Sequence, residues 1–465
     1  MRTEIEQQVL NKYMPDEKER AEVAEIGGRI IDCVKRIAGI EVLMTGSASR
    51  GTFVKGDKDI DIFMQFPPEL SIDELKTRGL DTAYAVVREF GGTAVEKYAE
   101  HPYLNATIEG FDVDLVPCYH VASTAEMKCA VDRTPFHARY LIPRIGNLKE
   151  DVILLKQFCK GGGVYGSDLM TGGFSGYLCE LLILAYGGFD KFMHAASKFR
   201  YGEVVDLENY YPDKKEARRL FSEPLIVIDP TDKDRNVAAA LTRTRFSEFM
   251  ELARDYCVKP DARYFIPDSP TTISEQEFAR TLKERGTAML AISLRTPGIV
   301  EDTIVPQLRK TMESIKAQLI AEEFLVHRAE VAMKDEHCLI IFELLVDRLP
   351  AIIVRQGPPV WNHANADKFV EKYIGQGEFA GPWIFEDRYF TEVRRKYLTA
   401  QSLLEDRNRI FSGALGKHVR ASMEEHYDVL AGEEIWSEEF SDFLSAYFLR
   451  SSHAVRKLRR IANGD

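Results

Sequence analysis

The sequence predicts an α+β, multidomain protein. A mixed β-sheet near the N-terminus is expected to be followed by a helical neck, a small α/β body and a mainly helical C-terminal tail region. Three observations support this prediction. A chain of 465 residues is too long for one ordinary hydrophobic core. Extended and helical segments alternate up to about residue 120, and helical spacing of apolar residues dominates from Asp151 onward. The expected domains are residues 1–145, 146–266, 267–355 and 356–465.

The N-terminal domain is expected to open with helices and to continue as a sheet. Apolar residues at helical spacing predict helix over residues 3–37, interrupted near Pro15. Two apolar strands, EVLMTGS and DIDIFMQF, then flank a small polar turn. After a helix near residues 71–90, turn residues separate three further extended segments, which are TAVEKYAEHPY, NATIEGF and DVDLVPCYH.

The remainder of the chain is expected to be richer in helix. Helical segments after Asp151 end at glycines, and the strand PLIVIDP leads through a turn into a helix expected to begin at Arg235. Ser274 and Glu277 form a capping box that opens a helix ending at Gly286. The order helix–strand–helix–strand–strand that starts there suits a small split α/β sandwich.

Composition favours a cytoplasmic globular protein with no membrane partner. No apolar run is long enough to cross a bilayer, and the N-terminus is too charged for a signal peptide. The seven cysteines are scattered and never spaced as Cys-x-x-Cys, which argues against a disulfide framework or a structural zinc site. The net charge of −12 argues mildly against nucleic-acid binding, although it says little about local patches.

Two acids lie on one face of an apolar strand. Side chains alternate along a strand, so Asp59 and Asp61 project the same way, with α-carbons about 6.6 Å apart. Two carboxylates at that spacing can share a hard cation or bridge two of them. The later strand FDVDLVPCY repeats the pattern with Asp112 and Asp114, and a third carboxylate joins the site if the two strands pair. The alternative is an exposed sheet edge that carries acids.

The turn between the first two strands can bind an anion. It is not a Walker A loop, because Thr52 follows Gly51 where a Gly-Lys-Ser/Thr sequence is required. Gly46 and Ser47 nevertheless offer backbone N–H groups and a hydroxyl, and Arg50 adds a guanidinium. A turn of this kind beside metal-binding acids predicts a site for a triphosphate and its magnesium.

These residues resemble a known family. In this chain a Gly-Ser pair is followed, after eleven residues, by Asp-Ile-Asp-Ile, and an acid on a later strand completes the pattern. This pattern resembles the signature of the DNA polymerase β-like nucleotidyltransferase superfamily. The stretches AEHPY, VDLVPCY, AVDRTPFH, GFSGYLCELL, DPTDKDRNVAA and ERGTA resemble the archaeal-type (class I) CCA-adding tRNA nucleotidyltransferases. The resemblance is strong over about residues 1–330 and looser beyond, for instance in LGKHV.

The resemblance implies roles for individual residues. It makes the first domain a nucleotidyltransferase head, in which two magnesium ions are held by Asp59, Asp61 and Asp114. Relatives can carry Glu at the position of Asp59, and the position of Asp112 is acidic but not catalytic in them. The triphosphate contacts would be Gly46, Ser47, Arg50, His137, Lys156 and Tyr165, and Arg235 would read the base of CTP or ATP. Without the resemblance, Lys156 would be taken for a solvated lysine, Tyr165 for a loop anchor and His137 for a capping or packing residue.

The resemblance also implies an activity and partners. The enzyme would add C, C and A to the 3′ end of tRNA from CTP and ATP without a nucleic-acid template, and the family suggests a homodimer. The tRNA would be held through its acceptor and T-arm region by shape and phosphate contacts. A basic run is the candidate for part of that surface, and it comprises Arg450, Arg456, Lys457, Arg459 and Arg460. The alternative for this run is a solvated cationic helix face.

Two other functions share the same signature. A poly(A) polymerase-like RNA-tailing enzyme would use ATP alone on single-stranded RNA. A small-molecule nucleotidyltransferase would leave about 300 residues beyond the head without a purpose.

Overall fold

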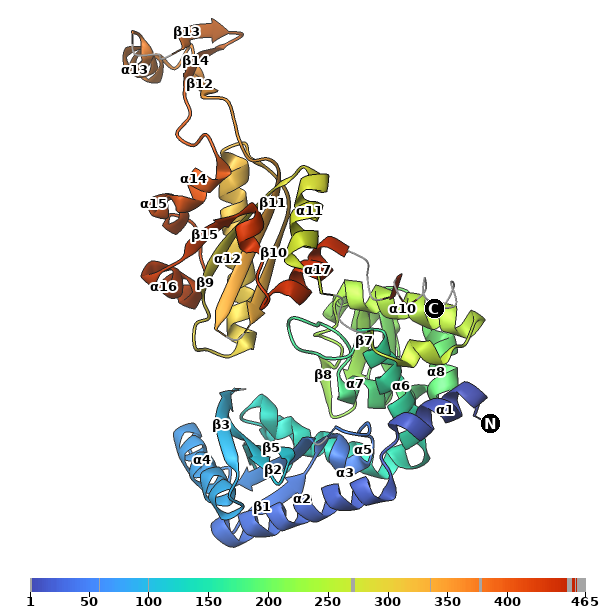
Figure 1. The fold of residues 1–465 in the computed structure, drawn as a ribbon. Helices are drawn as coiled ribbons and strands as arrows, with labels where there is room; N and C mark the ends of the chain where they lie inside the picture. The colour runs from blue at the N-terminus through green and yellow to red at the C-terminus, as the bar shows by residue number, and fades with distance from the viewer. Residues whose placement is uncertain are drawn as a thin grey trace. The chain divides into compact units, whose positions relative to one another are not determined.

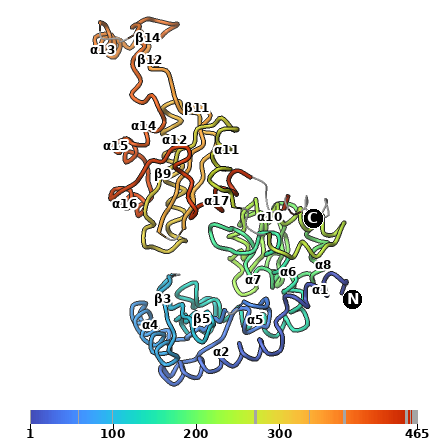
Figure 2. The backbone as a smooth tube through the Cα atoms, viewed as in Figure 1, coloured from blue at the N-terminus to red at the C-terminus, as the bar shows by residue number. Residues whose placement is uncertain are grey.

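The computed structural model describes residues 2–57, 59–98, 100–268, 272–334, 336–375, 379–449, 454, 455 and 457. The chain forms two compact units, which are Met1–Ser269 with Ser451–Asp465, and Pro270–Arg450. Figure 1 labels most of their helices and strands, and Figure 2 traces the path of the backbone through both. Each helix in the described part of the chain is too short or too polar to cross a lipid bilayer.

The first unit begins with two helices and a five-stranded sheet, most of which can be followed in Figure 1. The helix break predicted near Pro15 is confirmed. The elements are α1 (Glu4–Tyr13), α2 (Glu17–Ala38), β1 (Glu41–Met44), α3 (Gly46–Arg50), β2 (Asp59–Phe66), α4 (Ile72–Glu89), β3 (Thr93–Tyr98), β4 (Pro102–Ile108) and β5 (Phe111–Tyr119). The strand order is β1-β2-β5-β4-β3, and only the β2–β5 pair is parallel, so the sheet is mixed as predicted.

The two faces of this sheet differ in character. The side chains of Ile60, Ile62 and Val113 are buried in a cluster with apolar residues of α2 and α4. The register of β2 with β5 places Asp59 opposite Asp112 and Asp61 opposite Asp114. Since side chains alternate, all four acids project from the face that α2 and α4 leave uncovered. The strand pairing on which the third carboxylate depends is therefore confirmed.

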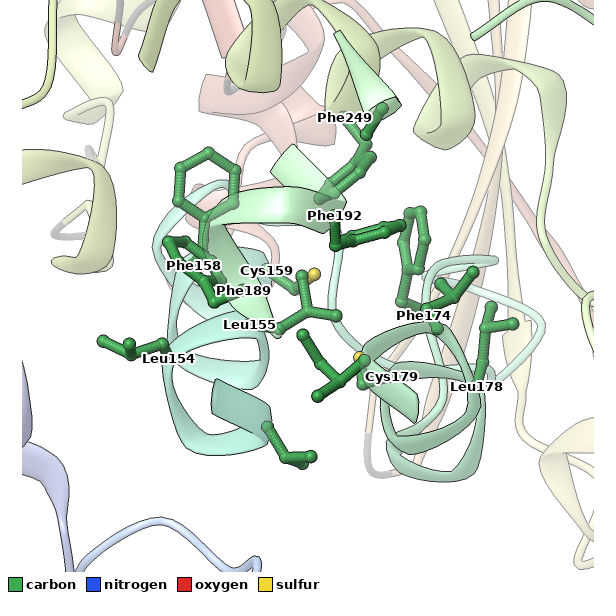
Figure 3. Packing of buried hydrophobic residues seen from close by; sticks show 14 of the residues in the cluster. Leu154, Leu155, Phe158, Cys159, Phe174, Leu178, Cys179, Phe189, Phe192 and Phe249 are labelled. Atoms are coloured by element: carbon green, nitrogen blue, oxygen red, sulfur yellow. The ribbon is translucent and has the colours of Figure 1, made fainter. Parts of the chain in front are cut away.

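The rest of the first unit is built mainly of helices. Its elements are α5 (Thr134–Ile145), α6 (Lys149–Gly161), α7 (Gly176–Tyr186), α8 (Phe189–Ala196), β6 (Glu203–Asp206), α9 (Lys214–Leu220), β7 (Leu225–Asp229), β8 (Asp232–Asn236) and α10 (Arg243–Val258). Figure 3 shows the core between them, where Phe158 of α6 and Phe189 and Phe192 of α8 gather with Phe249 of α10. Every side chain of α6 from Asp151 to Cys159 is buried, so the helix is a rigid support for the residues it carries.

The helix predicted to begin at Arg235 is a strand instead. Residues Asp232–Asn236 form β8, which pairs antiparallel with β7. The Asn236 side chain stabilises this hairpin, because its Oδ1 accepts from the backbone N–H of Val227 at 2.8 Å. The next helix starts only at Arg243, where the Thr242 side chain caps it. The prediction failed because a polar turn followed by charged residues fits a hairpin as well as a helix start.

The second unit is a four-stranded antiparallel sheet covered by helices on both faces. Its elements are α11 (Glu275–Arg285), β9 (Ala288–Arg295), α12 (Glu301–Ala321), β10 (Leu325–Lys334), β11 (His337–Val346), β12 (Ile352–Pro359), α13 (His363–Tyr373), β13 (Ala380–Phe385), β14 (Arg388–Arg394), α14 (Ala400–Glu405), α15 (Arg407–Phe411), α16 (Lys417–Glu425), β15 (Asp428–Ala431) and α17 (Ser441–Leu449). The sheet order is β10-β11-β9-β15. The predicted capping box of Ser274 and Glu277 and the left-handed cap at Gly286 are both present.

The C-terminal region departs from the boundary expected at residue 355. The strands β12, β14 and β13 form a separate three-stranded sheet inside a region that otherwise consists mainly of helices, which are α13 to α17. The chain then returns, as Figure 2 shows, and β15 pairs with β9 while α16 packs on α12. Buried apolar residues such as Leu404, Val419 and Met423 share one core with α12 and β11. Burial of these side chains holds residues 397–431 to the body rather than to a separate tail.

Candidate active site

One open pocket of about 310 Å³ in the first unit gathers most of the predicted catalytic and nucleotide-binding residues. Its walls come from the turn after β1, from β2 and from the region of α5, α6 and α7. The lining residues are Thr45, Gly46, Ser47, Arg50, Asp61, Phe63, Thr134, His137, Lys156, Tyr165, Gly176 and Tyr177. Seven of the residues singled out in the sequence therefore meet here, although they span more than 100 positions of the chain.

Gly46 allows the turn to approach the acids of β2. Its φ of +64° lies in the left-handed region, which favours glycine. A Cβ built at this position would lie 1.8 Å from Oδ2 of Asp61, far inside any van der Waals contact. The backbone N–H of Thr45 donates to the carbonyl oxygen of Asp61 at 2.9 Å and locks the two segments together. The turn and the acid are thus in direct contact.

The three predicted metal-binding acids share one face of the sheet. Burial, reinforced by the charges of Asp114 and Asp59, raises the pKa of Asp61 to about 6. Burial also raises the pKa of Asp59 and of Asp114. As the side chains stand, Oδ1 of Asp114 accepts from the amide of Asn105 at 2.7 Å. Among the described residues, no three His, Cys, Asp or Glu side chains converge into a ready-made metal cluster.

Arg50 is held by a buried glutamate from the opposite wall. Its Nε donates to Oε1 of Glu180 at 2.9 Å, and its second guanidinium nitrogen lies 2.8 Å from Oε2. Glu180 is fully buried on α7, and it also accepts from the hydroxyl of Thr52. This two-point pairing fixes the direction of the guanidinium, so Arg50 lines the pocket in one orientation.

Lys156 and Tyr165 lie close together on another wall. The Lys156 Nζ donates to the carbonyl oxygen of Thr52 at 3.0 Å, and burial lowers the pKa of this lysine. A Cβ at Gly176 would lie 3.2 Å from the Tyr165 hydroxyl and 3.5 Å from Nζ of Lys156, so this glycine leaves room for both side chains. Lys156 is therefore not the solvated lysine that its helix alone would suggest.

A second buried carboxylate connects His137 with Arg235. Oδ2 of Asp229 lies 2.8 Å from Nε2 of His137 and accepts from Arg235 at 2.8 Å. The His137 ring stacks on Tyr177, with centroids 4.0 Å apart, and burial lowers the pKa of the histidine. Burial acts to raise the pKa of Asp229, but the hydrogen bonds it accepts from His137 and Thr231 hold it well below its usual range. Asp229 is therefore ionised at neutral pH.

Three polar residues that hold this site were missed in the sequence. Glu180 stands alone in the apolar helix segment CELLILA, and Asp229 ends the buried strand LIVID. An acid inside so apolar a segment needs a partner, and that signal could have identified both. Asn105, whose amide contacts Asp114 and Asp112, carries no comparable signal, because a polar residue on a half-exposed strand is common.

The basic run near the C-terminus is only partly described. Lys457 is 3% exposed, and its Nζ forms an ion pair with Asp268 at 2.8 Å. The prediction that Lys457 lies on an RNA-binding surface is therefore wrong, because its charge is already neutralised inside the protein. The other four residues of the run, Arg450, Arg456, Arg459 and Arg460, lie outside the described residues.

A glycine-serine turn seated against two neighbouring acid-bearing strands is typical of a nucleotidyltransferase. Residues 28–137 match the family model described as nucleotidyltransferase domain. Farther along, residues 150–266 match the second domain of tRNA nucleotidyltransferase, and residues 285–432 match the C-terminal domain of the CCA-adding enzyme. The chain belongs to the CCA-adding enzyme family.

Full-length relatives lead to the same family. A CCA-adding enzyme of Methanoregula boonei is 44% identical over 98% of this chain and 97% of its own length. That of Methanosarcina mazei is 41% identical over 94% of this chain and 95% of its own. The CCA-adding enzyme of Methanothermobacter thermautotrophicus is 36% identical over 94% of this chain and 96% of its own length. Among solved structures, a cytoplasmic RNA terminal U-transferase aligns with 57% of this chain and 97% of its own at 17% identity, with a TM-score of 0.45, too distant to bear on the activity.

Proposed function

We propose that this protein is a CCA tRNA nucleotidyltransferase that adds C, C and A in turn to the 3′ end of tRNA, using CTP and ATP and releasing pyrophosphate without a template. The observation that carries the proposal is the pocket in which Asp61 faces two fixed cations, Arg50 and Lys156, across the glycine-serine turn. An acid beside paired cations suits a nucleotide that brings both a metal and a polyphosphate.

Asp59, Asp61 and Asp114 are the proposed ligands of two magnesium ions. All three offer the oxygen donors that magnesium prefers, and they share one face of two adjacent strands. Their raised pKa values fit this role, because a divalent cation would relieve the repulsion among the carboxylates. When bound, the metal would activate the attacking 3′-hydroxyl and neutralise charge on the triphosphate.

The remaining pocket residues are proposed to bind the nucleotide. The triphosphate would contact the N–H groups and hydroxyl of Gly46 and Ser47, with charge supplied by Arg50 and Lys156. His137 and Tyr165 would add hydrogen bonds from the adjacent wall, and Arg235 would read the base. Because Glu180 and the carbonyl oxygen of Thr52 already orient both cations, little side-chain entropy would be lost on nucleotide binding.

The decisive experiment supplies magnesium, a tRNA that lacks its last three nucleotides, and each nucleoside triphosphate alone and in combination. Two C additions with CTP alone, and termination after one A when ATP is also present, are expected. An unstructured RNA serves as the control acceptor. Long A tails on either RNA would support a poly(A) polymerase instead, and no addition to any RNA would overturn the proposal.

The proposal extends to assembly, partners and location. Residues 1–145 would form the catalytic head and residues 146–266 the neck that holds the base and the tRNA end. The acceptor and T-arm region of the tRNA would lie on the second unit. A homodimer in the cytoplasm is proposed, and light scattering should then give a particle of twice the 52.9 kDa chain mass. A particle of one chain mass at micromolar concentration would refute the dimer.

A further inference from the structure

Asp229 accepts an unusual number of hydrogen bonds. Its Oδ1 accepts from the backbone N–H of Thr231 at 2.9 Å, from the Thr231 hydroxyl at 2.8 Å and from the Tyr177 hydroxyl at 3.3 Å. Its Oδ2 contacts His137 and Arg235, each at 2.8 Å. The side chain is fully buried at the end of β7. These donors come from α5, α7 and the β7–β8 hairpin, so one carboxylate joins three parts of the pocket wall.

The two residues on Oδ2 have different neighbours. His137 lines the pocket beside the glycine-serine turn and Arg50. The Arg235 side chain is about one-third exposed and projects from β8. Oδ2 of Asp229 therefore holds both residues. His137 faces the proposed triphosphate site, and Arg235 is the residue proposed to face the base.

We propose that Asp229 is a positioning residue that couples base selection to triphosphate binding, by holding Arg235 and His137 on a single carboxylate oxygen. The inference rests on the proposed function, because it takes the roles of Arg235 and His137 from there. A nucleotide with the correct base would draw Arg235 into one hydrogen-bonded arrangement and leave His137 in place. A wrong base would pull Arg235 away and strain the bond that holds His137 beside the phosphates.

A carboxylate is required at this position, and an amide cannot replace it. The backbone N–H of Thr231 and the guanidinium of Arg235 can only donate, and they contact different oxygens. In Asp229→Asn, the NH₂ group must therefore face one of these two donors. The orientation that keeps the Thr231 bond releases Arg235, and the orientation that keeps Arg235 loosens the β7–β8 hairpin on which Arg235 sits. Either way the guanidinium loses its fixed direction.

The test measures kcat/KM for CTP and for UTP on tRNA that lacks its last three nucleotides. Asp229→Asn is expected to lower the CTP/UTP ratio about 10-fold and to raise KM for CTP several-fold. Arg235→Ala should lower the same ratio, and the double variant should lower it no further, because both changes remove one interaction. Asp234→Asn is the matched control on the same strand, because among the described residues its exposed carboxylate meets only the Tyr211 hydroxyl, at 3.5 Å. It should leave the ratio unchanged.

The outcomes separate this inference from the proposed function. If Arg235→Ala lowers the ratio and Asp229→Asn lowers only kcat, equally for all nucleotides, the coupling role is refuted and the proposed function stands. If Arg235→Ala leaves the ratio unchanged, the base-reading role fails and the inference fails with it. Should Asp229→Asn not fold, as a thermal melt would show, Thr231→Val removes one donor and keeps the carboxylate. An unchanged ratio in that variant would also refute the coupling.

Discussion

Replacing Gly46 with alanine should separate activity from stability. The added Cβ would lie 1.8 Å from Oδ2 of Asp61, whereas real Cβ atoms essentially never approach another atom closer than 3.0 Å. The Asp61 carboxylate must therefore move by about 1.2 Å or more, or the turn must retreat by the same amount. A misplacement of about 1 Å in a catalytic group typically costs about 100-fold in rate. We expect kcat to fall about 100-fold in Gly46→Ala.

The stability cost should be much smaller. Alanine in the left-handed region costs roughly 1 kcal/mol, and Asp61 faces an open pocket into which it can turn. The melting temperature should fall by about 2–4 °C for a unit of this size. Gly39→Ala is a matched control, because Gly39 has the same φ of +64° and a Cβ there would meet no atom of the described residues within 4 Å. It should lower the melting temperature similarly and leave activity unchanged.

The assay is single-turnover addition of C to tRNA under saturating CTP, with a thermal melt of each variant. The single-turnover rate reports the chemical step without product release. Near-normal activity of Gly46→Ala would show that the contact with Asp61 is not needed for catalysis. Equal activity losses in both variants would show that the backbone strain matters and the clash does not.

Three further variants test other parts of the structure. Glu343→Gln should lower the unfolding free energy of the second unit by about 1.5–3 kcal/mol, because it removes the charge of a fully buried carboxylate that accepts hydrogen bonds from the partly exposed Arg285 and from Thr287. The exposed Glu284→Gln should change it by less than about 0.5 kcal/mol. The hydrogen bonds to Glu343 hold its pKa below its usual range, so in denaturant melts the stability they provide is present above about pH 4.5 and is lost as the pH falls through the lowered pKa. In calorimetry, magnesium should raise the melting temperature of metal-free wild type, and Asp61→Asn should abolish most of that shift, since its carboxylate is a proposed ligand. Arg50→Lys should raise KM for CTP about 10-fold in steady-state kinetics, because lysine cannot pair with both oxygens of Glu180, and an unchanged KM would exclude Arg50 from the triphosphate site.

Much of the local structure could be predicted from residue patterns. The boundaries of β2, the helix break near Pro15 and the capping box at Ser274 depend on interactions within a few residues. The same is true of the face on which Asp59 and Asp61 lie, because alternation along a strand is a property of the backbone. These features needed no knowledge of the rest of the chain.

Predictions that depended on distant partners failed or stayed open. The segment after Asp232 is a strand because β7 and the Asn236 side chain hold it there. The charge of Lys457 is buried because Asp268 meets it, almost 190 residues away in the chain. Residues 397–431 join the body because β9 offers them a free edge. None of these partners is visible within the segment itself.

The sequence by itself determined which residues have the chemistry for nucleotidyl transfer, because the spacing of glycine, serine and acids sets which groups share a turn or a strand face. Only the tertiary structure decided which of them meet. The parallel pairing of β2 with β5 places Asp114 beside Asp61, and packing of α6 and α7 brings Lys156 and Glu180 to the turn. The physical reason is that the choice of a strand partner and the burial of a charge depend on free energies of packing summed over the whole unit.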